Sequence, residues 1–313
     1  RGGNHVSGGA ERGRGTSRCC GPDAVQDAKC VCDKLGIRHY VPDYADELEK
    51  WVIGPFVEEY IHGRTPNPCV VCNRYLKFGS LMARAVAFGF DALATGHYAA
   101  VDERGGRYRL IRPRDKRKDQ TYFLYHIAPE VLPQVLFPLG PYTKEEVRAI
   151  ASRAALLVAA KAESQDVCFV TQKTCRAFLQ ERLGEVKTGR IVDQSGRVLG
   201  SHKGIAFYTV GQRGGLGISH PVPLYVVKID AEKNEIVVGE KKDLAGRNLI
   251  AGDLNLFRSD WPEVVNAKIR YRKKESPCRV SFENGRVRVV FMEDQEAITP
   301  GQSVVFYEGD DVL

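Results

Sequence analysis

The spacing of apolar residues in the first half of the chain alternates between a helical and a strand period. Residues 25–35 place apolar side chains on one helical stripe, and Gly36 stands where this helix has to end. Residues 37–41 are then predicted to form a strand. Two further helices are predicted at residues 47–61, with an interruption at Gly54-Pro55, and at residues 77–88, before a short apolar run at residues 92–94. Helices and strands in alternation predict a parallel α/β sheet.

One more helix of this region has a clear start. Thr143 and Glu146 have the spacing of a capping box, in which each side chain accepts a hydrogen bond from the backbone N–H of the other residue. Four apolar residues at helical spacing then predict its buried face, namely Val147, Ile150, Ala151 and Ala154.

Beyond residue 170 the pattern changes twice. A single helical stretch and short strands between glycines predict a small α+β linking domain, with these elements at residues 175–183, 190–192 and 205–210. From residue 224 onward only strand-like runs follow, at residues 224–229, 235–238, 267–272, 279–282 and 287–291. Turn signals such as Glu283-Asn284-Gly285 separate them, which predicts a small antiparallel β-barrel or sandwich. The expected domains are residues 1–170, 171–223 and 224–313.

The composition is that of a globular protein, with 43% hydrophobic and 27% charged residues in a chain of 313. The longest apolar run, residues 154–160, is far shorter than the roughly 20 residues that span a bilayer, so we expect no membrane span. The N-terminus lacks the apolar segment of a secretory signal. Nine cysteines, an odd number, argue against a disulfide scaffold and predict a reducing, cytoplasmic location. A net charge of +7 permits a polyanionic partner without requiring one.

The most specific local feature is the segment 63–73, where a glycine and two prolines force a loop. Cys69 and Cys72 follow this loop, three residues apart, just before the predicted helix. A thiolate near a helix N-terminus has a lowered pKa, which suits a nucleophilic or sulfur-carrying cysteine. The pair could instead be inert, or be half of a zinc site completed by Cys19 and Cys20 or by Cys30 and Cys32. The residues alone leave these alternatives open, and we assign no metal ligands.

Two groups of basic residues are candidates for contact with an RNA backbone. If residues 267–274 form a strand, alternation places every second residue on one basic face: Lys268, Arg270, Arg272 and Lys274. Such a stripe could follow RNA, or be an ordinary solvated face. The second group is a run that could meet phosphates or simply be solvated: Arg112, Arg114, Lys116 and Arg117.

Several motifs occur along this chain in the order in which they occur in a known family. They are residues 63–73 with Lys77-Phe78-Gly79, residues 94–98, 118–124, 136–140, 163–169, 208–217 and 299–302. With these motifs the chain resembles the bacterial tRNA-specific 2-thiouridylases, the MnmA family of the PP-loop ATPase group, from about Cys19 to its end. The resemblance implies a PP-loop nucleotide-binding catalytic domain followed by the two smaller domains.

The activity that the resemblance implies is ATP-dependent 2-thiolation of the wobble uridine of tRNA. ATP, with Mg²⁺, adenylates the uridine C2 oxygen, and a cysteine persulfide supplies the sulfur. In the family the persulfide carrier precedes a phenylalanine, here Cys168, and its partner precedes an asparagine, here Cys72, which leaves Cys69 a bystander. The two cysteines can end as a disulfide. The implied partners are tRNAs that read glutamate, glutamine and lysine codons, and a persulfide relay protein or cysteine desulfurase.

The resemblance also implies binding residues. Gly96 and His97 are placed near the nucleotide, for which a purely structural histidine is the rival interpretation. Contact with the target base and the RNA backbone is implied for Lys118, Asp119 and Gln120. A position close to the RNA is implied for Gln212 and Arg213.

The chain departs from the family at its start. The family holds the ATP pyrophosphate with the sequence Ser-Gly-Gly-x-Asp-Ser, whereas here Ser7, Gly8 and Gly9 are followed by Ala-Glu-Arg. Cys19 comes too soon afterwards for the family's first helix and second strand, so we expect an N-terminally incomplete domain. Ser7, Gly8 and Gly9 remain the candidates for the pyrophosphate loop. Two alternative functions follow, a degenerate or truncated member that binds tRNA without catalysis and a zinc-stabilised RNA-binding protein.

Overall fold

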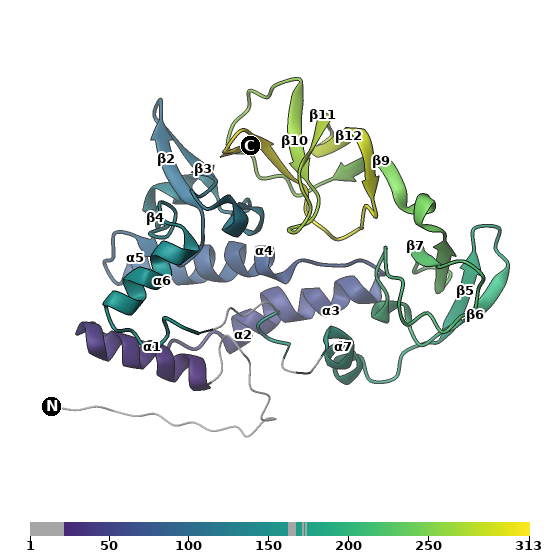
Figure 1. The fold of residues 1–313 in the computed structure, drawn as a ribbon, viewed down its shortest axis with the longest axis horizontal. Coiled ribbons are helices and arrows are strands. Elements are labelled where there is room, and N and C mark those ends of the chain that lie inside the picture. Colours follow the sequence, from purple (N-terminus) through teal and green to yellow (C-terminus); the bar gives the residue numbers. More distant parts are fainter. Residues whose placement is uncertain (1–21, 162–166, 171, 173) are drawn as a thin grey trace.

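A computed structural model describes residues 22–161, 167–170, 172 and 174–313 of the protein (Figure 1). The candidate loop residues Ser7, Gly8 and Gly9, and also Cys19 and Cys20, lie outside the described residues. In Figure 1 two long helices run across the middle, with the C-terminal sheet above them and the strands of the middle part to the right. Within the described residues, no helix is both long and apolar enough to cross a membrane.

The first predicted helix is confirmed, but the strand predicted after it is wrong. Helix α1 (Pro22–Leu35) ends at Gly36, as its apolar stripe indicates. Residues 37–41 have no strand assignment, and Tyr40 and Val41 are 69% and 64% exposed. A strand depends on hydrogen bonds to a neighbouring strand, and none in the described part of the chain pairs with these residues.

Helix 45–61 is continuous where an interruption was predicted. It passes through α2 (Ala45–Leu48), the π-helical η1 (Glu49–Ile53) and α3 (Gly54–Ile61). Because Pro55 has no N–H to donate, it disrupts the regular α-helical hydrogen-bond pattern. The wider turn of η1 directly before it keeps the helix running.

Helix 68–87 begins well before the predicted start at residue 77. It passes through α4 (Pro68–Cys72), η2 (Asn73–Leu81) and α5 (Met82–Ala87). Pro68 occupies the first helical turn, where its fixed φ suits the helix and its missing N–H costs nothing. Trp51 of the first long helix stacks on Tyr75 of the second, with ring centroids 5.0 Å apart, and so holds the two helices together.

The N-terminal part contains a small parallel sheet of β1 (Leu93–Ala94) and β4 (Val135–Leu136). Helix α6 (Lys144–Arg153) follows with the predicted capping box, because Glu146 N donates to Thr143 Oγ1 at 3.2 Å and Thr143 N donates to Glu146 Oε2 at 2.7 Å. The predicted burial of its apolar face is wrong: Ile150 is 40% exposed and none of the α6 residues is buried.

Short 3₁₀ turns connect these elements and lead into a shared core. They are η3 (Lys116–Lys118), η4 (Thr121–Phe123) and η5 (Pro129–Gln134). Tyr122 and Leu124 of this segment are fully buried, and they pack in one cluster with Val305 and Tyr307 from the C-terminal strands. The N-terminal and C-terminal parts therefore share a hydrophobic core.

The middle part contains α7 (Cys175–Leu183), as predicted, and a four-stranded sheet. The strands are β5 (Gly189–Asp193), β6 (Val198–His202), β7 (Tyr225–Asp230) and β8 (Glu235–Gly239), in the order β6-β5-β8-β7. Hydrogen bonding in this sheet therefore crosses the boundary expected between residues 223 and 224. The strand predicted at residues 205–210 is wrong, because its apolar side chains are buried from a 3₁₀ turn, η6 (Ile205–Phe207).

The C-terminal part is an antiparallel sheet in the order β2-β3-β14-β13-β10-β11-β12-β9. After the 3₁₀ turn η7 (Lys241–Leu244), its C-terminal strands are β9 (Ala245–Ala251), β10 (Val264–Lys268), β11 (Ser276–Glu283), β12 (Arg286–Glu296), β13 (Val305–Glu308) and β14 (Asp311–Val312). Asn284 and Gly285 both have positive φ, at +50° and +70°, and make the predicted tight turn between β11 and β12.

An N-terminal hairpin completes this sheet, which was not predicted. It consists of β2 (Ala100–Arg104) and β3 (Arg107–Ile111). Ile111 of β3 pairs with Asp311 of β14, so segments about 200 residues apart lie side by side.

The three parts of the chain meet at residues 297–303, here called the junction loop. Thr65 N donates a hydrogen bond to Pro300 O at 2.8 Å, and Gln302 Nε2 donates one to Thr65 O at 2.7 Å. Gly301 has a φ of +90°, and a Cβ on it would lie 2.8 Å from Thr65 N, so the close approach requires glycine. The junction loop thus holds the turn that leads into helix 68–87.

Candidate active site

Cys69 and Cys72 lie inside the second long helix, not before it as predicted. Asn67 is extended, with φ −112° and ψ 92°, and the helix begins at Pro68. Cys69 is therefore in the first turn and exposed, whereas Cys72 is one turn further along and half-buried.

Asn73 fixes the helix directly after Cys72. Its side chain is 2% exposed, and Nδ2 donates to the carbonyl oxygen of Phe123 at 2.8 Å. Phe123 belongs to the motif at residues 118–124, which the sequence alone separates widely from Cys72. The hydrogen bond therefore connects two of the motifs and limits how far Cys72 can move.

Cys168 lies beside an aromatic cluster on α3. Its side chain is half-buried, and the next residue, Phe169, packs edge-on against Phe56 of α3 with centroids 5.2 Å apart. Phe169 also contacts Phe178 of α7, with centroids 5.5 Å apart. These contacts fix the short segment that carries the thiol.

Both cysteine segments pack against the same helix. Helix 45–61 meets α4 through η1, where Trp51 stacks on Tyr75, and meets the Cys168 segment through Phe56. Trp51 and Phe56 are less than two helical turns apart, or about 8 Å along the axis. The fold therefore attaches two segments that are remote in the sequence to one helix.

A groove of about 1010 Å³ lies between this helix pair and the C-terminal sheet. One wall is formed by residues of helix 68–87 next to Cys72, including Val71, Arg74 and Tyr75. The other is formed by residues 248–256 and by the junction loop. Arg74 reaches across and pairs with Asp253 at 2.5 Å. The volume of the groove is at the upper end of the range of ligand pockets, about 300–1,000 Å³.

His97 is held as a neutral side chain at the end of β1. Burial, with the nearby charge of Lys77, lowers the pKa of His97 to about 3. Lys77 Nζ is 3.4 Å from Nε2 and Thr95 Oγ1 is 2.8 Å from Nδ1. Because an ammonium group can only donate, Nε2 accepts, and Nδ1 carries the proton that it donates to Thr95. Gly96, between them, is exposed at the carboxyl end of the strand.

This histidine makes stability depend on pH. Between its unfolded pKa of about 6.5 and its folded pKa of about 3, the unfolded chain binds the proton and the folded chain does not, so stability falls as pH falls through this window. As the pH falls from 6 to 4, we expect the free energy of unfolding to decrease more steeply in the wild type than in the His97→Gln variant. The difference in slope should be up to about 1.4 kcal/mol per pH unit. Denaturant unfolding at several pH values measures this slope.

The matched control for that comparison is His220→Gln, because the His220 ring is exposed in the folded chain. The stability of this variant should depend on pH in the same way as that of the wild type. Identical slopes for His97→Gln and the wild type would contradict the neutral, buried assignment of His97.

The side chains of Asp119 and Gln120, predicted to contact RNA, have partners inside the protein. Asp119 is 7% exposed, and its Oδ1 accepts hydrogen bonds from Thr121 N at 2.9 Å and Thr121 Oγ1 at 2.6 Å. Gln120 Oε1 accepts from Tyr98 N at 2.8 Å, which fastens this motif to the one that contains His97. Lys118 is half-buried in η3.

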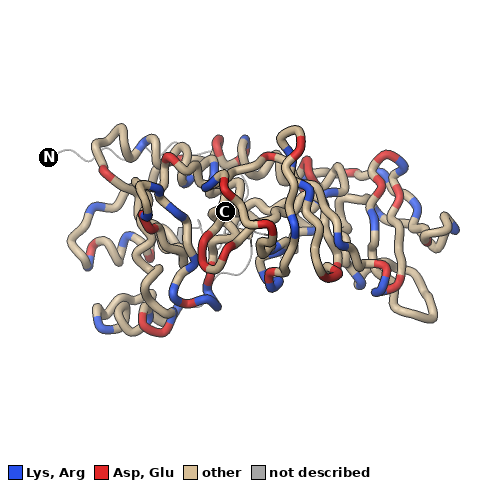
Figure 2. The backbone as a smooth tube through the Cα atoms, turned by 90° about the horizontal axis from the view of Figure 1, so that it is seen from above, with Lys and Arg blue, Asp and Glu red and all other residues tan. Residues whose placement is uncertain are grey.

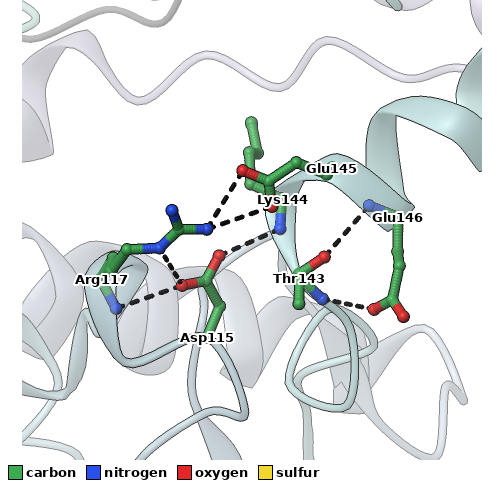
Figure 3. Close-up of polar contacts among 6 residues, drawn as sticks. All are labelled: Asp115, Arg117, Thr143, Lys144, Glu145 and Glu146. Carbon is green, nitrogen blue, oxygen red and sulfur yellow. Dashed lines mark hydrogen bonds and ion pairs between the residues drawn. The ribbon is translucent and has the colours of Figure 1, made fainter.

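The basic run before this motif is paired with carboxylates. Arg112 pairs with Glu275, Arg114 with Glu146, Lys116 with Asp310, and Arg117 with Asp115 and Glu145. Figure 3 shows Asp115 between two elements, accepting from Arg117 N at 3.2 Å and Lys144 N at 3.1 Å. Figure 2 shows the same mixing of positive and negative residues along much of the backbone. This run therefore serves mainly to join local elements.

The predicted strand at residues 267–274 is wrong, and with it the basic stripe. Strand β10 ends at Lys268, and the chain then turns, with Lys273 N donating to Arg270 O at 3.1 Å. Arg270 points inward and donates to Val210 O at 3.3 Å, to Ala297 O at 2.9 Å and to the Thr299 hydroxyl. The guanidinium group, which strand alternation predicted to be on the surface, is instead bound by acceptors inside the protein. Arg272 is exposed.

Gln212 and Arg213 occupy a turn attached to β7. Gln212 Oε1 accepts from Thr209 N at 3.1 Å, and its Nε2 donates to Gly214 O at 2.8 Å, so this side chain shapes the turn. Arg213 is exposed. Among the described residues, no group of three or more His, Cys, Asp or Glu is arranged to hold a metal ion.

Comparison with known proteins agrees with the order of these parts. Three domain families match in succession: the tRNA methyl transferase HUP domain over residues 6–172, the tRNA methyl transferase PRC-barrel domain over residues 176–240, and the aminomethyltransferase beta-barrel domain over residues 247–313. The chain is 55% identical over 296 residues to tRNA-specific 2-thiouridylase MnmA 1 of Syntrophus aciditrophicus, covering 95% of this chain and 80% of the relative. This chain belongs to the MnmA family.

Other MnmA proteins are nearly as similar. The tRNA-specific 2-thiouridylase of Carboxydothermus hydrogenoformans is 49% identical over 302 residues, which are 94% of this chain and 83% of the relative. The enzyme of Geobacter metallireducens is 47% identical over 309 residues, which are 97% of this chain and 84% of the relative. The predicted fold class is confirmed, with a HUP domain and parallel sheet first, then a PRC-barrel-like part and an antiparallel β-barrel domain.

Two features of the MnmA site have no clear signal in the sequence. The junction loop coincides with the motif at residues 299–302, but nothing local shows that it binds Thr65. The groove is formed by segments from opposite ends of the chain. Only the order of motifs indicated that these segments belong together.

Proposed function

We propose that this chain thiolates the wobble uridine of tRNA at C2, with Cys168 as the persulfide carrier and Cys72 as its partner. The observation that carries the proposal is the packing of both cysteine segments on helix 45–61, together with a groove of about 1010 Å³ lined by residues next to Cys72. Membership of the MnmA family and the names of its relatives support the same activity.

The chemistry needs two thiols that can reach one another. A persulfide on Cys168 presents a terminal sulfur that forms a bond to C2 as the activated oxygen departs. The Cys72 thiolate then attacks Cys168 Sγ and breaks the sulfur–sulfur bond, which leaves the thiocarbonyl on the base and a Cys72–Cys168 disulfide. In the alternative order, Cys72 attacks first and releases hydrosulfide, which attacks C2. A thiol reductant restores both cysteines in either order.

Other cysteines are less suited to this role. Burial raises the pKa of the Cys175 thiol, although Tyr60 partly offsets the effect by a hydrogen bond. Burial also raises the pKa of Cys278 to about 12. Since the thiolate is the nucleophile, both remain protonated and unreactive at neutral pH.

Gly96 and His97 fit a position beside a bound nucleotide. A Cβ on Gly96 would find only Leu139 within 4 Å, at 3.9 Å, so the backbone is open to close approach. When bound, ATP with Mg²⁺ turns the C2 oxygen into a good leaving group. His97, being neutral, adds no charge there, while Lys77 beside it supplies a fixed positive charge that favours phosphate.

The remaining assignments complete the proposal. The residues of the proposed RNA-binding surface are Lys118, Asp119, Gln120, Gln212, Arg213, Lys268, Arg270 and Arg272. The substrates are tRNAs for glutamate, glutamine and lysine, and sulfur comes from a persulfide relay protein or a cysteine desulfurase in the cytoplasm. Because the side chains of Arg270, Asp119, Gln120 and Gln212 already have internal partners, we expect these four to act by shaping the surface that meets RNA.

One observation favours the second candidate, a tRNA-binding protein without catalysis. Ser7, Gly8 and Gly9 are followed by Ala-Glu-Arg in place of the x-Asp-Ser of the pyrophosphate loop. A weakened loop would remove turnover while leaving the RNA surface intact.

Incubation of unmodified tRNA with this chain, ATP, Mg²⁺ and a persulfide source separates the two candidates. Thiolated tRNA migrates more slowly on a mercury-containing gel. We expect a retarded band that is absent when ATP is omitted. Intact tRNA binding without a retarded band would instead support the non-catalytic candidate.

A further inference from the structure

A small hollow on the outer face of the C-terminal sheet joins the groove. It has a volume of about 380 Å³ and is here called the β12 hollow, lined by Ile250, Glu283, Asn284, Arg286 and Arg288. Ile250 also lines the groove, so the two depressions share a border on strand β9. In the sheet Ile250 pairs directly with Arg288. A chain that leaves the groove across β9 therefore meets Arg288 next.

Strand alternation explains why both arginines face outward. Along β12, Val287, Val289 and Phe291 are buried, whereas Arg286 and Arg288 between them are exposed. Side chains two residues apart in a strand lie on the same face, so the two guanidinium groups are neighbours. Strand β12 therefore has a buried apolar face and an exposed basic face. This is the arrangement that was wrongly predicted for residues 267–274.

These arginines differ from others of the same sheet in lacking an acidic partner. Arg247 pairs with Asp294 at 2.6 Å and Arg279 pairs with Glu263 at 3.2 Å. For Arg286 and Arg288, no carboxylate among residues 22–161, 167–170, 172 and 174–313 lies within the 4.0 Å of an ion pair, although Glu283 is opposite Arg286 in the ladder. Their positive charge is therefore available to a ligand.

The chemistry of the hollow matches an RNA backbone. Two guanidinium groups and the Asn284 amide are donors suited to phosphate oxygens. Ile250 and Val290 on the same face are 62% and 40% exposed, which gives apolar surface for ribose. Phosphate contacts from arginine with nearby apolar contacts are typical of RNA-binding surfaces.

We infer that Arg286 and Arg288 bind backbone phosphates of the tRNA whose target base lies in the groove. The inference rests on the proposed function for the identity of the RNA, and it adds a second contact area on the opposite side of β9. Two phosphate contacts there displace counterions, so they strengthen binding most at low salt.

The test compares tRNA binding by the wild type and by the double variant Arg286→Gln, Arg288→Gln, without ATP or a sulfur source, over a range of salt concentrations. We expect about tenfold weaker binding at low salt and a slope of log affinity against log salt that is smaller by about 2. The control variant is Arg104→Gln, Arg153→Gln, which removes the same charge from exposed arginines outside both depressions. It should match the wild type.

Unchanged affinity and slope in the double variant would overturn the inference. A second result would also overturn it: the double variant binds tRNA normally, but it thiolates tRNA more slowly with a protein persulfide donor and at the normal rate with a small-molecule donor. The surface would then bind the donor protein and not the tRNA. Weaker tRNA binding by the double variant in a chain that never thiolates RNA supports the inference while refuting the proposed catalysis. Unfolding curves that coincide for all variants show that the sheet is intact.

Discussion

Serine in place of Cys72, or in place of Cys168, abolishes tRNA thiolation and leaves tRNA affinity within about twofold of the wild type. A serine hydroxyl cannot carry a sulfane sulfur or resolve a persulfide, so either change stops the transfer. We expect the rate to fall by at least about 10³-fold, as for the loss of an essential nucleophile. Both side chains are only half-buried, so the fold should persist. Single-turnover thiolation and filter binding measure the two quantities.

Cys69→Ser is the matched control for this pair. Cys69 lies one helical turn from Cys72 on the same helix, is exposed, and has the same chemistry available to it. We expect this variant to keep at least half of the wild-type rate. An active Cys72→Ser variant combined with an inactive Cys69→Ser variant would transfer the partner role to Cys69.

Replacing Arg270 with methionine destabilises the protein by about 3 kcal/mol. The guanidinium of Arg270 connects Val210 of the middle part with Ala297 and Thr299 of the junction loop. Methionine retains most of the apolar stem but leaves these acceptors without their charged donor, and hydrogen bonds to charged groups are worth about 1.5–3 kcal/mol each. Denaturant unfolding followed by one probe for all variants measures the loss.

Lys274→Met removes the same charge from the same predicted stripe. Lys274 is exposed, so its replacement should change stability by no more than about 0.5 kcal/mol. Equal stability losses for the two variants would contradict the stabilising role of the Arg270 hydrogen bonds. A loss of tRNA affinity by Arg270→Met at unchanged stability would restore the original interpretation of Arg270 as an RNA contact.

The elements that could be predicted from the sequence are those with local causes. The capping box at Thr143, the helix at residues 175–183 and the Asn284-Gly285 turn each depend on residues within a few positions. The strands predicted at residues 37–41 and 205–210 have the right apolar content, but no strand in the part of the chain that the structure describes pairs with them. Pairing is a property of the whole fold, and a local pattern does not contain it.

The candidate site could be predicted only as a set of separate motifs. The two cysteines were identified, but their common support on helix 45–61 depends on Trp51 and Phe56, which belong to neither motif. Arg270 was misplaced because alternation assumes a strand, and the inward hydrogen bonds that end β10 come from segments close in space but not in sequence. The basic face on β12 follows the same alternation rule, but none of the family motifs includes Arg286 or Arg288.

The pairing of β3 with β14 affects the order in which the protein can fold during synthesis. Ile111 leaves the ribosome about 200 residues before its partner Asp311, which at translation rates of about 5–20 residues per second is a delay of about 10–40 s. Throughout this time the outer edge of the β2–β3 hairpin has unpaired backbone groups, a hazard for association with other chains. The edge of β3 at Ile111 therefore stays without its partner strand until β14 emerges.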